Sequence, residues 1–327
     1  MDDSLIEQAA APGVSPLVIA APASRSTLDL SGARSRKTSE RVIGWVLFLC
    51  AAVSVMTSIG IVFVLFEQAI EFFTRISIVD FLTGTKWTPL FKSGQYGVLP
   101  LVSATLMVSG IAMLLALPLG LMSAIYLSEY APARARAWLK PVLELLAGVP
   151  TIVYGYFALT FISPQILKPI VPGLNPFNAL AAGIAVGIMI LPMVASLSED
   201  AMRVVPGALR EAAYSLGATK LEVSTKVVFP AALSGIFASA MLAISRAVGE
   251  TMIVAVAAGL RPQLTGDPRE GMETMTAWIV QLVSGEAVVG STPYLSLFAV
   301  GALLFLITLA LNIISQRVVA RYRQAYQ

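Results

Sequence analysis

Two charged residues four positions apart in an otherwise apolar stretch are the strongest candidates for chemistry in this chain. Arg246 and Glu250 occur in the segment LAISRAVGETMIV, near the middle of an apolar run from about residue 234 to 259. Residues spaced in this way share one face of a helix. A charge inside a membrane is costly, so it pairs with an opposite charge or faces a water-filled cavity. The spacing therefore predicts a shared polar site.

An arginine at such a site is suited to binding an oxyanion. Its planar guanidinium donates two parallel hydrogen bonds to two oxygens of one phosphate group. Glu250 would neutralise Arg246 in the absence of substrate, and it would accept a hydrogen bond from a protonated phosphate oxygen, which sulfate lacks at neutral pH. We predict that both residues contact the substrate on a translocation pathway. The alternative is an ion pair that only joins helices.

The composition is that of a membrane protein. Of the 327 residues, 57% are hydrophobic and 13% are charged, whereas about a quarter are charged in a soluble domain. Histidine is absent, which excludes Ser-His-Asp catalysis and histidine zinc sites. The single cysteine, Cys50, lies in an apolar segment, so we expect neither a disulfide framework nor a metal site. An intramembrane enzyme is disfavoured because no catalytic constellation is present.

Six apolar segments are long enough to span a membrane as helices. The predicted spans are approximately residues 43–66, 102–127, 141–161, 179–197, 234–259 and 294–314. Six spans place both termini on one side. Fifteen of the 22 Lys and Arg residues lie on that side and six on the other. Because cytoplasmic loops carry the excess of positive charge, this side is predicted to be cytoplasmic.

The chain divides by composition into three parts. Residues 1–40 are rich in Ala, Pro and Ser and are predicted to be a disordered cytoplasmic tail. Residues 41–97 are expected to hold the first transmembrane helix and an external loop, and residues 98–320 the main transmembrane domain. Residues 272–284 are predicted to form a short amphipathic helix at the external interface. Contact of this helix with an external partner is a second interpretation.

Two smaller features complete the interpretation. Glu144 follows Lys140 by four residues near the cytoplasmic end of the third span, so we expect these two residues to form an ion pair. A role of Glu144 in gating is the alternative. Pro118, Pro150 and Pro192 lie in or beside spans, where each removes a backbone hydrogen bond. We expect most of them to serve packing in the helix bundle, and a kinked wall of the pathway is the alternative.

A polar segment, residues 199–230, separates the fourth and fifth spans. Glu211, Ala212 and Ala213 begin its helix-forming part, and Gly217 follows four residues later. We expect Gly217 to divide the segment into two short helices that meet at a right angle and protrude from the membrane. The spacing resembles the EAA loop of ABC-transporter permeases, which is the helix that couples them to a separate ATPase. An ordinary amphipathic loop is the alternative.

Other segments look like one branch of that family, the phosphate-uptake permeases of the PstC type. The sequences KWTP and YGVLP favour this type over the related PstA type. The resemblance implies an all-α membrane protein with six transmembrane helices and a MetI-like ABC importer permease fold with a cytoplasmic coupling helix. The long N-terminal tail departs from the family pattern. The resembling stretches are residues 81–89, 124–132, 143–156, 211–230, 245–252 and 298–312.

The resemblance also implies a function and a set of partners. The chain is expected to be a permease subunit of an ATP-driven inorganic phosphate importer in the bacterial inner membrane. Its implied partners are a PstA-like permease, two PstB-like ATPase subunits and an external PstS-like phosphate-binding protein, with no nucleic acid. ATP and Mg are expected on the ATPase, and no cofactor on this chain, which lacks a phosphate-binding loop.

The resemblance assigns residues as well as a function. Arg246 and Glu250 match the RA-x-GE segment of the family. The coupling role is carried over to Glu211, Ala212, Ala213 and Gly217.

Other transport functions remain open at this point. A permease for molybdate, sulfate, phosphonate or an amino acid would carry the same coupling loop. A neutral or cationic solute would not need Arg246 inside the membrane. A transporter driven by an ion gradient would need no coupling loop and would usually show an internal repeat, which we do not find.

Overall fold

The computed structural model describes residues 33–92 and 94–322. The chain divides into two units, one ending at Ile59 and the other beginning at Gly60. The described part of the first unit is the beginning of helix α1 (Ala33–Arg75). The predicted disordered tail is therefore too long, because residues 33–40 are helical. The rest of that prediction, residues 1–32, lies outside the described residues.

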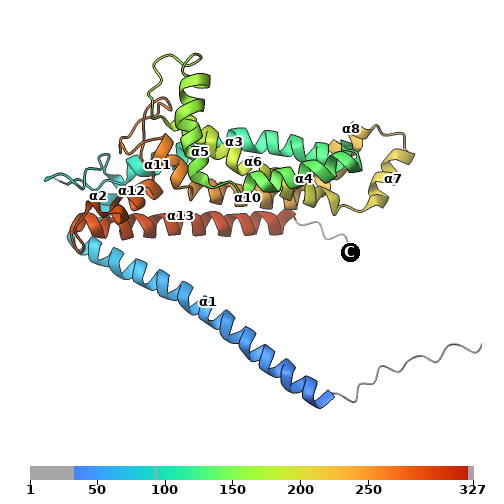
Figure 1. The fold of residues 1–327 in the computed structure, drawn as a ribbon, viewed down its shortest axis with the longest axis horizontal. Coiled ribbons are helices and arrows are strands. Elements are labelled where there is room, and N and C mark those ends of the chain that lie inside the picture. The colour runs from blue at the N-terminus through green and yellow to red at the C-terminus, as the bar shows by residue number, and fades with distance from the viewer. Residues whose placement is uncertain (1–32, 93, 323–327) are drawn as a thin grey trace, which may run out of the picture. The chain divides into compact units, whose positions relative to one another are not determined.

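The second unit is built from helices, with one isolated antiparallel bridge between Trp87 and Tyr96 among its described residues. Figure 1 shows α7 and α8 at one end of this unit and α2 and α12 at the other. After α1 the elements are α2 (Ile78–Thr83), α3 (Leu99–Ile125), η2 (Tyr126–Tyr130), α4 (Ala133–Ala147), α5 (Thr151–Phe157), η3 (Ala158–Leu167), α6 (Ala179–Arg203), α7 (Gly207–Ser215), α8 (Lys220–Glu222), η4 (Val223–Val228), α9 (Phe229–Ala231), α10 (Leu233–Val248), α11 (Met252–Ala257), α12 (Met275–Gln281), η5 (Leu282–Glu286) and α13 (Thr292–Tyr322).

Helices α3 and α6 form the centre of this unit, and α10 packs against both. Small residues allow the close approach. A Cβ added to Gly187 would lie 3.0 Å from the carbonyl oxygen of Ala112, and one added to Gly183 would lie 2.6 Å from Cβ of Ile111. Small side chains at helix contacts are typical of membrane bundles, where backbones pack closely.

The number of spans depends on how two bent helix pairs are counted. Four helices in the described chain are long and apolar enough to cross a membrane. Two further pairs meet this test only together: Ala133–Ala147 with Thr151–Leu167, bent by 87°, and Lys220–Ala231 with Leu233–Val248, bent by 71°. If each bent pair is one span, the total is six, the predicted number, but the second pair includes residues 220–230, which were predicted to lie in the polar segment.

The structure corrects two of the predicted spans. The third, residues 141–161, is not one helix, because the chain bends by 87° between α4 and α5. Pro150 caps α5 at this bend, as expected of a residue that cannot continue the hydrogen-bond ladder. The fifth, residues 234–259, is also broken, since α10 ends at Val248 and α11 begins at Met252.

The predicted interfacial helix in residues 272–284 exists as α12, but it is buried. Trp278 is 2% exposed and stacks edge-to-face on Trp87, with ring centroids 5.3 Å apart. Its Nε1 donates a hydrogen bond to the Ser296 hydroxyl, 3.2 Å away. Apolar and aromatic residues on one face of a short helix fit a core as well as an interface, so the sequence pattern did not distinguish the two.

The segment before α3 belongs to the same core as α12 and α13. Phe72, Phe81 and Val98 are buried in one cluster with Met275 and Leu295. The division expected between residues 97 and 98 therefore does not separate two packing units.

Candidate functional site

The structure separates the two residues predicted to form the polar site. Glu250 does not continue α10, because Gly249 ends that helix. Its carboxylate Oε1 instead accepts hydrogen bonds from the backbone N–H groups of Met252 (3.1 Å) and Ile253 (3.2 Å). Its own carbonyl accepts a bond from the Thr276 hydroxyl at 2.7 Å. Glu250 is thus a buried residue that caps α11 and joins it to α12.

Arg246 lies in the last turn of α10 and is exposed. Within the described part of the chain it forms neither an ion pair nor a hydrogen bond with any residue. The predicted pairing with Glu250 on a shared helix face is therefore wrong, because the helix breaks between them. The break leaves a guanidinium inside a predicted span that is open to a ligand or to another chain.

The helix break is held from the side by α5. A Cβ added to Gly155 would lie 3.0 Å from Cα of Ile253, so the two backbones are in direct contact. Tyr154, the preceding residue, donates its hydroxyl to the carbonyl of Leu146 across the α4–α5 bend at 2.7 Å. The bend and the break therefore lie next to each other and are packed as one region.

The polar segment between α6 and α10 has the predicted form of two short helices. Gly217 lies between α7 and α8 with φ of +82°, a left-handed conformation that glycine adopts without steric cost. Thr219 and Glu222 then form a capping box that starts α8. Ala213 is half-buried, whereas Glu211 and Ala212 are exposed.

Large apolar side chains are exposed on this segment. Val204 is 83% exposed and Leu216 88%, and Tyr214 and Leu221 are exposed as well. Exposed apolar groups gathered on one polar segment mark a site of interaction with another protein. The EAA spacing indicates where these four residues lie, but not that they are apolar and exposed.

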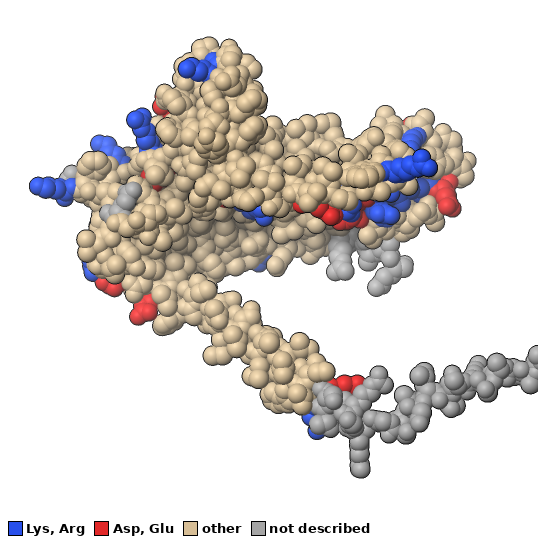
Figure 2. Space-filling view, viewed as in Figure 1, with Lys and Arg blue, Asp and Glu red and all other residues tan. Residues whose placement is uncertain are grey.

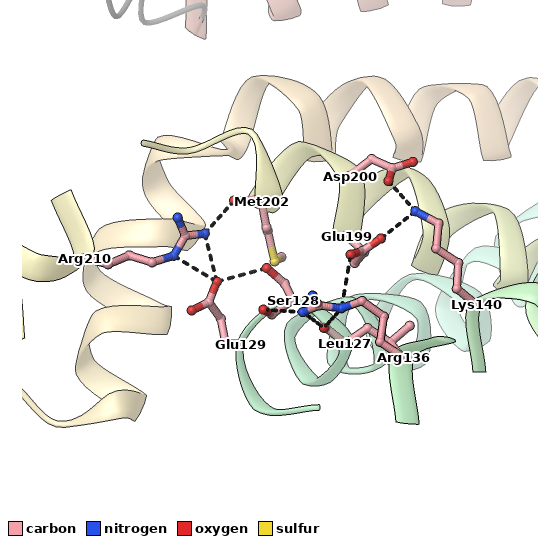
Figure 3. Close-up of polar contacts among 9 residues, drawn as sticks. All are labelled: Leu127, Ser128, Glu129, Arg136, Lys140, Glu199, Asp200, Met202 and Arg210. Atoms are coloured by element: carbon pink, nitrogen blue, oxygen red, sulfur yellow. Dashed lines mark hydrogen bonds and ion pairs between the residues drawn. The ribbon is translucent and has the colours of Figure 1, made fainter. Parts of the chain in front are cut away.

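Sequence reasoning missed a cluster of ion pairs beside this segment (Figure 3). Lys140 was expected to pair with Glu144, but Glu144 is exposed and Lys140 contacts Glu199 at 2.8 Å and Asp200 at 2.5 Å. These partners are about sixty residues away in the chain, beyond the reach of helix-spacing rules. The one available signal was Glu199 itself, a carboxylate at the end of an apolar span.

The opposite end of the unit carries a loop between α11 and α12. In this loop the Arg269 guanidinium and backbone N–H lower the pKa of the Asp267 carboxyl to about 2 through hydrogen bonds. Asn175 donates to Glu270 at 2.6 Å and ties the loop to the start of α6. Figure 2 shows charged side chains gathered at both ends of this unit, with few on the surface between them. That distribution fits a protein whose middle lies in a bilayer.

Comparison of the sequence with known proteins identifies the family of this chain. Residues 116–324 match the family model described as "binding-protein-dependent transport system inner membrane component". A probable ABC transporter permease protein of Bacillus subtilis, YqgH, is 33% identical over 88% of this chain and 94% of its own length. The phosphate transport system permease protein PstC of Mesorhizobium japonicum is 35% identical over 74% of this chain and 78% of its own.

Solved structures agree on the fold. A chain of a bacterial alginate ABC transporter matches 86% of this chain and 96% of its own length with a TM-score of 0.61 at 16% identity. A chain of the MetNI methionine ABC transporter matches 70% of this chain and 95% of its own with a TM-score of 0.52 at 19% identity. At these identities the match concerns the fold alone. The described helices therefore have the arrangement of an ABC importer permease, as predicted.

Proposed function

This chain belongs to the family of binding-protein-dependent transport system inner membrane components, and on that premise we propose that it is a permease subunit of an ATP-driven inorganic phosphate importer. The observation that carries the proposal is Arg246, an exposed guanidinium without a partner in the described chain at the break after α10. A charge held in an apolar span without a partner serves a ligand more often than packing. The relatives named for phosphate transport support phosphate as that ligand.

The proposed importer needs further subunits. A second, PstA-like permease would complete the pathway, and a PstS-like protein would deliver phosphate from outside. Of the two PstB-like ATPases, one would bind the exposed surface of α7 and α8 on this chain and the other would bind the second permease. ATP and Mg would be held by the ATPases, so that this chain transports without catalysing hydrolysis. Both termini and the α7 end would be cytoplasmic.

Uptake of labelled phosphate tests the proposed substrate. Cells without their own high-affinity system would express this chain with its proposed partners and would receive micromolar phosphate, with or without an excess of sulfate. We expect uptake that resists sulfate and requires this chain. Uptake of molybdate, sulfate or phosphonate in place of phosphate would assign the chain to another oxyanion.

The position of Glu250 predicts a role in rejecting sulfate. Its Oε1 is engaged in capping α11, and its second oxygen would accept the proton of hydrogen phosphate. Glu250→Gln keeps a capping oxygen but adds an N–H group that can bond sulfate. We expect sulfate to displace phosphate about tenfold more effectively from the variant, since a hydrogen bond to a charged group is worth about 1.5–3 kcal/mol.

The measurement is the binding of labelled phosphate to the purified importer without the external binding protein, whose own selectivity would mask the effect. Equal displacement by sulfate in the variant and the wild type would exclude this role for Glu250.

The turn at Gly217 predicts an effect on assembly with the ATPase. Alanine in the left-handed conformation costs about 1–2 kcal/mol, and space around Gly217 is open, so packing is not disturbed. We expect Gly217→Ala to lower the amount of ATPase that copurifies with the permease several-fold. Gly207→Ala is the matched control, because Gly207 is equally open but lies inside α7. Equal retention in both variants would contradict the coupling role of this turn.

A further inference from the structure

Six charged side chains form one cluster where four elements meet near the α7 end (Figure 3). We call this cluster the ionic junction. The elements are η2, α4, α6 and α7, which are separated in sequence but joined here by direct contacts. The members of the junction are Glu129, Arg136, Lys140, Glu199, Asp200 and Arg210.

Arg210 links α7 to two other elements. Its Nη2 lies 3.0 Å and its Nε 3.3 Å from Oε1 of Glu129 in η2. The same guanidinium donates to the carbonyls of Val205 (2.6 Å) and Met202 (2.9 Å). Carbonyls at the end of a helix lack partners within it and favour a cation. Arg210 therefore joins α7 to the end of α6 and to η2.

Arg136 makes the reciprocal arrangement from α4. It donates to the carbonyls of Leu127 and Ser128 at the end of the α3–η2 helix, the latter at 2.8 Å. Its Nε lies 3.7 Å from the carboxylate of Glu199 in α6. Each arginine thus binds the terminal carbonyls of one helix and a carboxylate of the other. The pairs cross, so that α3 and α6 are held together at this end from both sides.

Glu199 makes the junction difficult to open. Its side chain is fully buried and accepts a hydrogen bond from Lys140 Nζ at 2.8 Å. A buried carboxylate that loses its cation is strongly unfavourable, because neither water nor another charge compensates it. A buried ion pair therefore joins α4 and α6 at this end.

Helix α4 connects the junction with the helix break. It leads through the 87° bend into α5, whose Gly155 lies against the backbone of Ile253. The N–H of Ile253 in turn donates to the Glu250 carboxylate at 3.2 Å. A continuous series of contacts thus runs from α7 to the residues that flank the break after Arg246.

We propose that the ionic junction transmits the movement of α7 to α4 and α6, and so couples ATP hydrolysis on the partner subunits to opening of the pathway at the helix break. The inference rests on the proposed function, since it assigns α7 as the ATPase contact. Arg210 and Glu129 are positioning residues, because neither touches substrate or nucleotide. Without Arg210 or Glu129, the ATPases still bind the exposed contact surface and hydrolyse ATP, but less phosphate is imported per ATP hydrolysed.

The test is the number of phosphate ions imported per ATP hydrolysed by the complete importer in vesicles. Phosphate-loaded binding protein is supplied on the side of the vesicle membrane opposite the α7 end of the importer. Glu129→Gln removes the charge and keeps the size of the side chain. We expect the ratio of phosphate to ATP to fall about tenfold, the factor that corresponds to losing one charge-assisted bond. ATP hydrolysis should stay within about twofold of the wild type, less than the effect of one charge-assisted bond, because Glu129 lies outside the exposed ATPase-contact surface.

Glu71→Gln is the matched control, because Glu71 forms an exposed ion pair with Arg75 outside the junction. The double variant Glu129→Gln with Arg210→Gln should be no worse than the more severe single variant, since the two residues act as one pair. If Glu129→Gln does not assemble, Arg210→Lys replaces it, because lysine keeps the charge but cannot reach the carboxylate and both carbonyls together. That variant should also lower the ratio.

A ratio equal to the wild type in the junction variants, or additive losses in the double variant, would overturn the inference. A wild-type importer that moves another oxyanion would defeat the proposed substrate instead, and the same ratio measured with that oxyanion would still test the junction.

Discussion

Replacing Arg246 by glutamine is expected to reduce phosphate uptake about tenfold to a hundredfold at limiting phosphate. Arg246, in the last turn of α10, forms no hydrogen bond or ion pair with another described residue. Under the proposed function, its loss therefore removes a contact to the substrate and no polar contact among the described residues. A charge-assisted hydrogen bond is worth about 1.5–3 kcal/mol, and each 1.4 kcal/mol changes an equilibrium about tenfold. The measurement is initial uptake of labelled phosphate at equal membrane levels of the variant and the wild type.

Two further variants show whether the charge or the geometry of Arg246 matters. Arg246→Lys keeps the charge but cannot donate two parallel bonds to one phosphate, so uptake should lie between those of the glutamine variant and the wild type. Arg317→Gln is the matched control, because Arg317 is also an exposed arginine of a membrane helix. Uptake by Arg246→Gln within about twofold of the control would mean that Arg246 does not contact the substrate, since loss of a charge-assisted hydrogen bond should reduce uptake by more than about twofold.

Substitution of Gly97 by alanine is expected to prevent normal folding of the segment before α3. A Cβ at Gly97 would lie 2.2 Å from the carbonyl carbon of Gly84, and this neighbour is backbone that cannot rotate away. Gly97 N–H also donates to the Lys86 carbonyl at 3.0 Å. Separating the two strands of chain would disturb the buried cluster around Trp87 and Phe81. Overpacking costs about 1–3 kcal/mol where neighbours can adjust, and here they cannot.

The stability of the purified protein tests this expectation. Gly97→Ala should lower the thermal transition and the amount of protein recovered from membranes. Gly110→Ala is the control, because nothing lies within 4 Å of a Cβ at Gly110 and alanine is the better helix former. A Gly97→Ala protein as stable as Gly110→Ala would mean that the contact between Gly84 and Gly97 relaxes without cost.

Sequence patterns were sufficient to predict helices and turns that depend on residues close together in the chain. Apolar runs located the long helices, because a helix that meets lipid must be apolar along its length. The spacing around Gly217 predicted two short helices and their turn, since only glycine adopts that backbone conformation freely. Pro150 lies at the bend between α4 and α5, but the apolar run around it was predicted as one span. The family resemblance, and the fold that it implied, followed from the same segments.

Tertiary structure decided everything that depended on which helices touch. The break at Gly249 separated Arg246 from Glu250, although their spacing alone favoured a pair. The pattern of α12 suited an interface, but Trp87 and Ser296 enclose Trp278 in a core. Lys140 paired with Glu199 and not with Glu144, because a buried carboxylate requires a cation more strongly than an exposed one does. The sequence by itself determined the helices, the turn and the family, and only the packing of α4 against α6 and of α5 against α11 decided which charges meet.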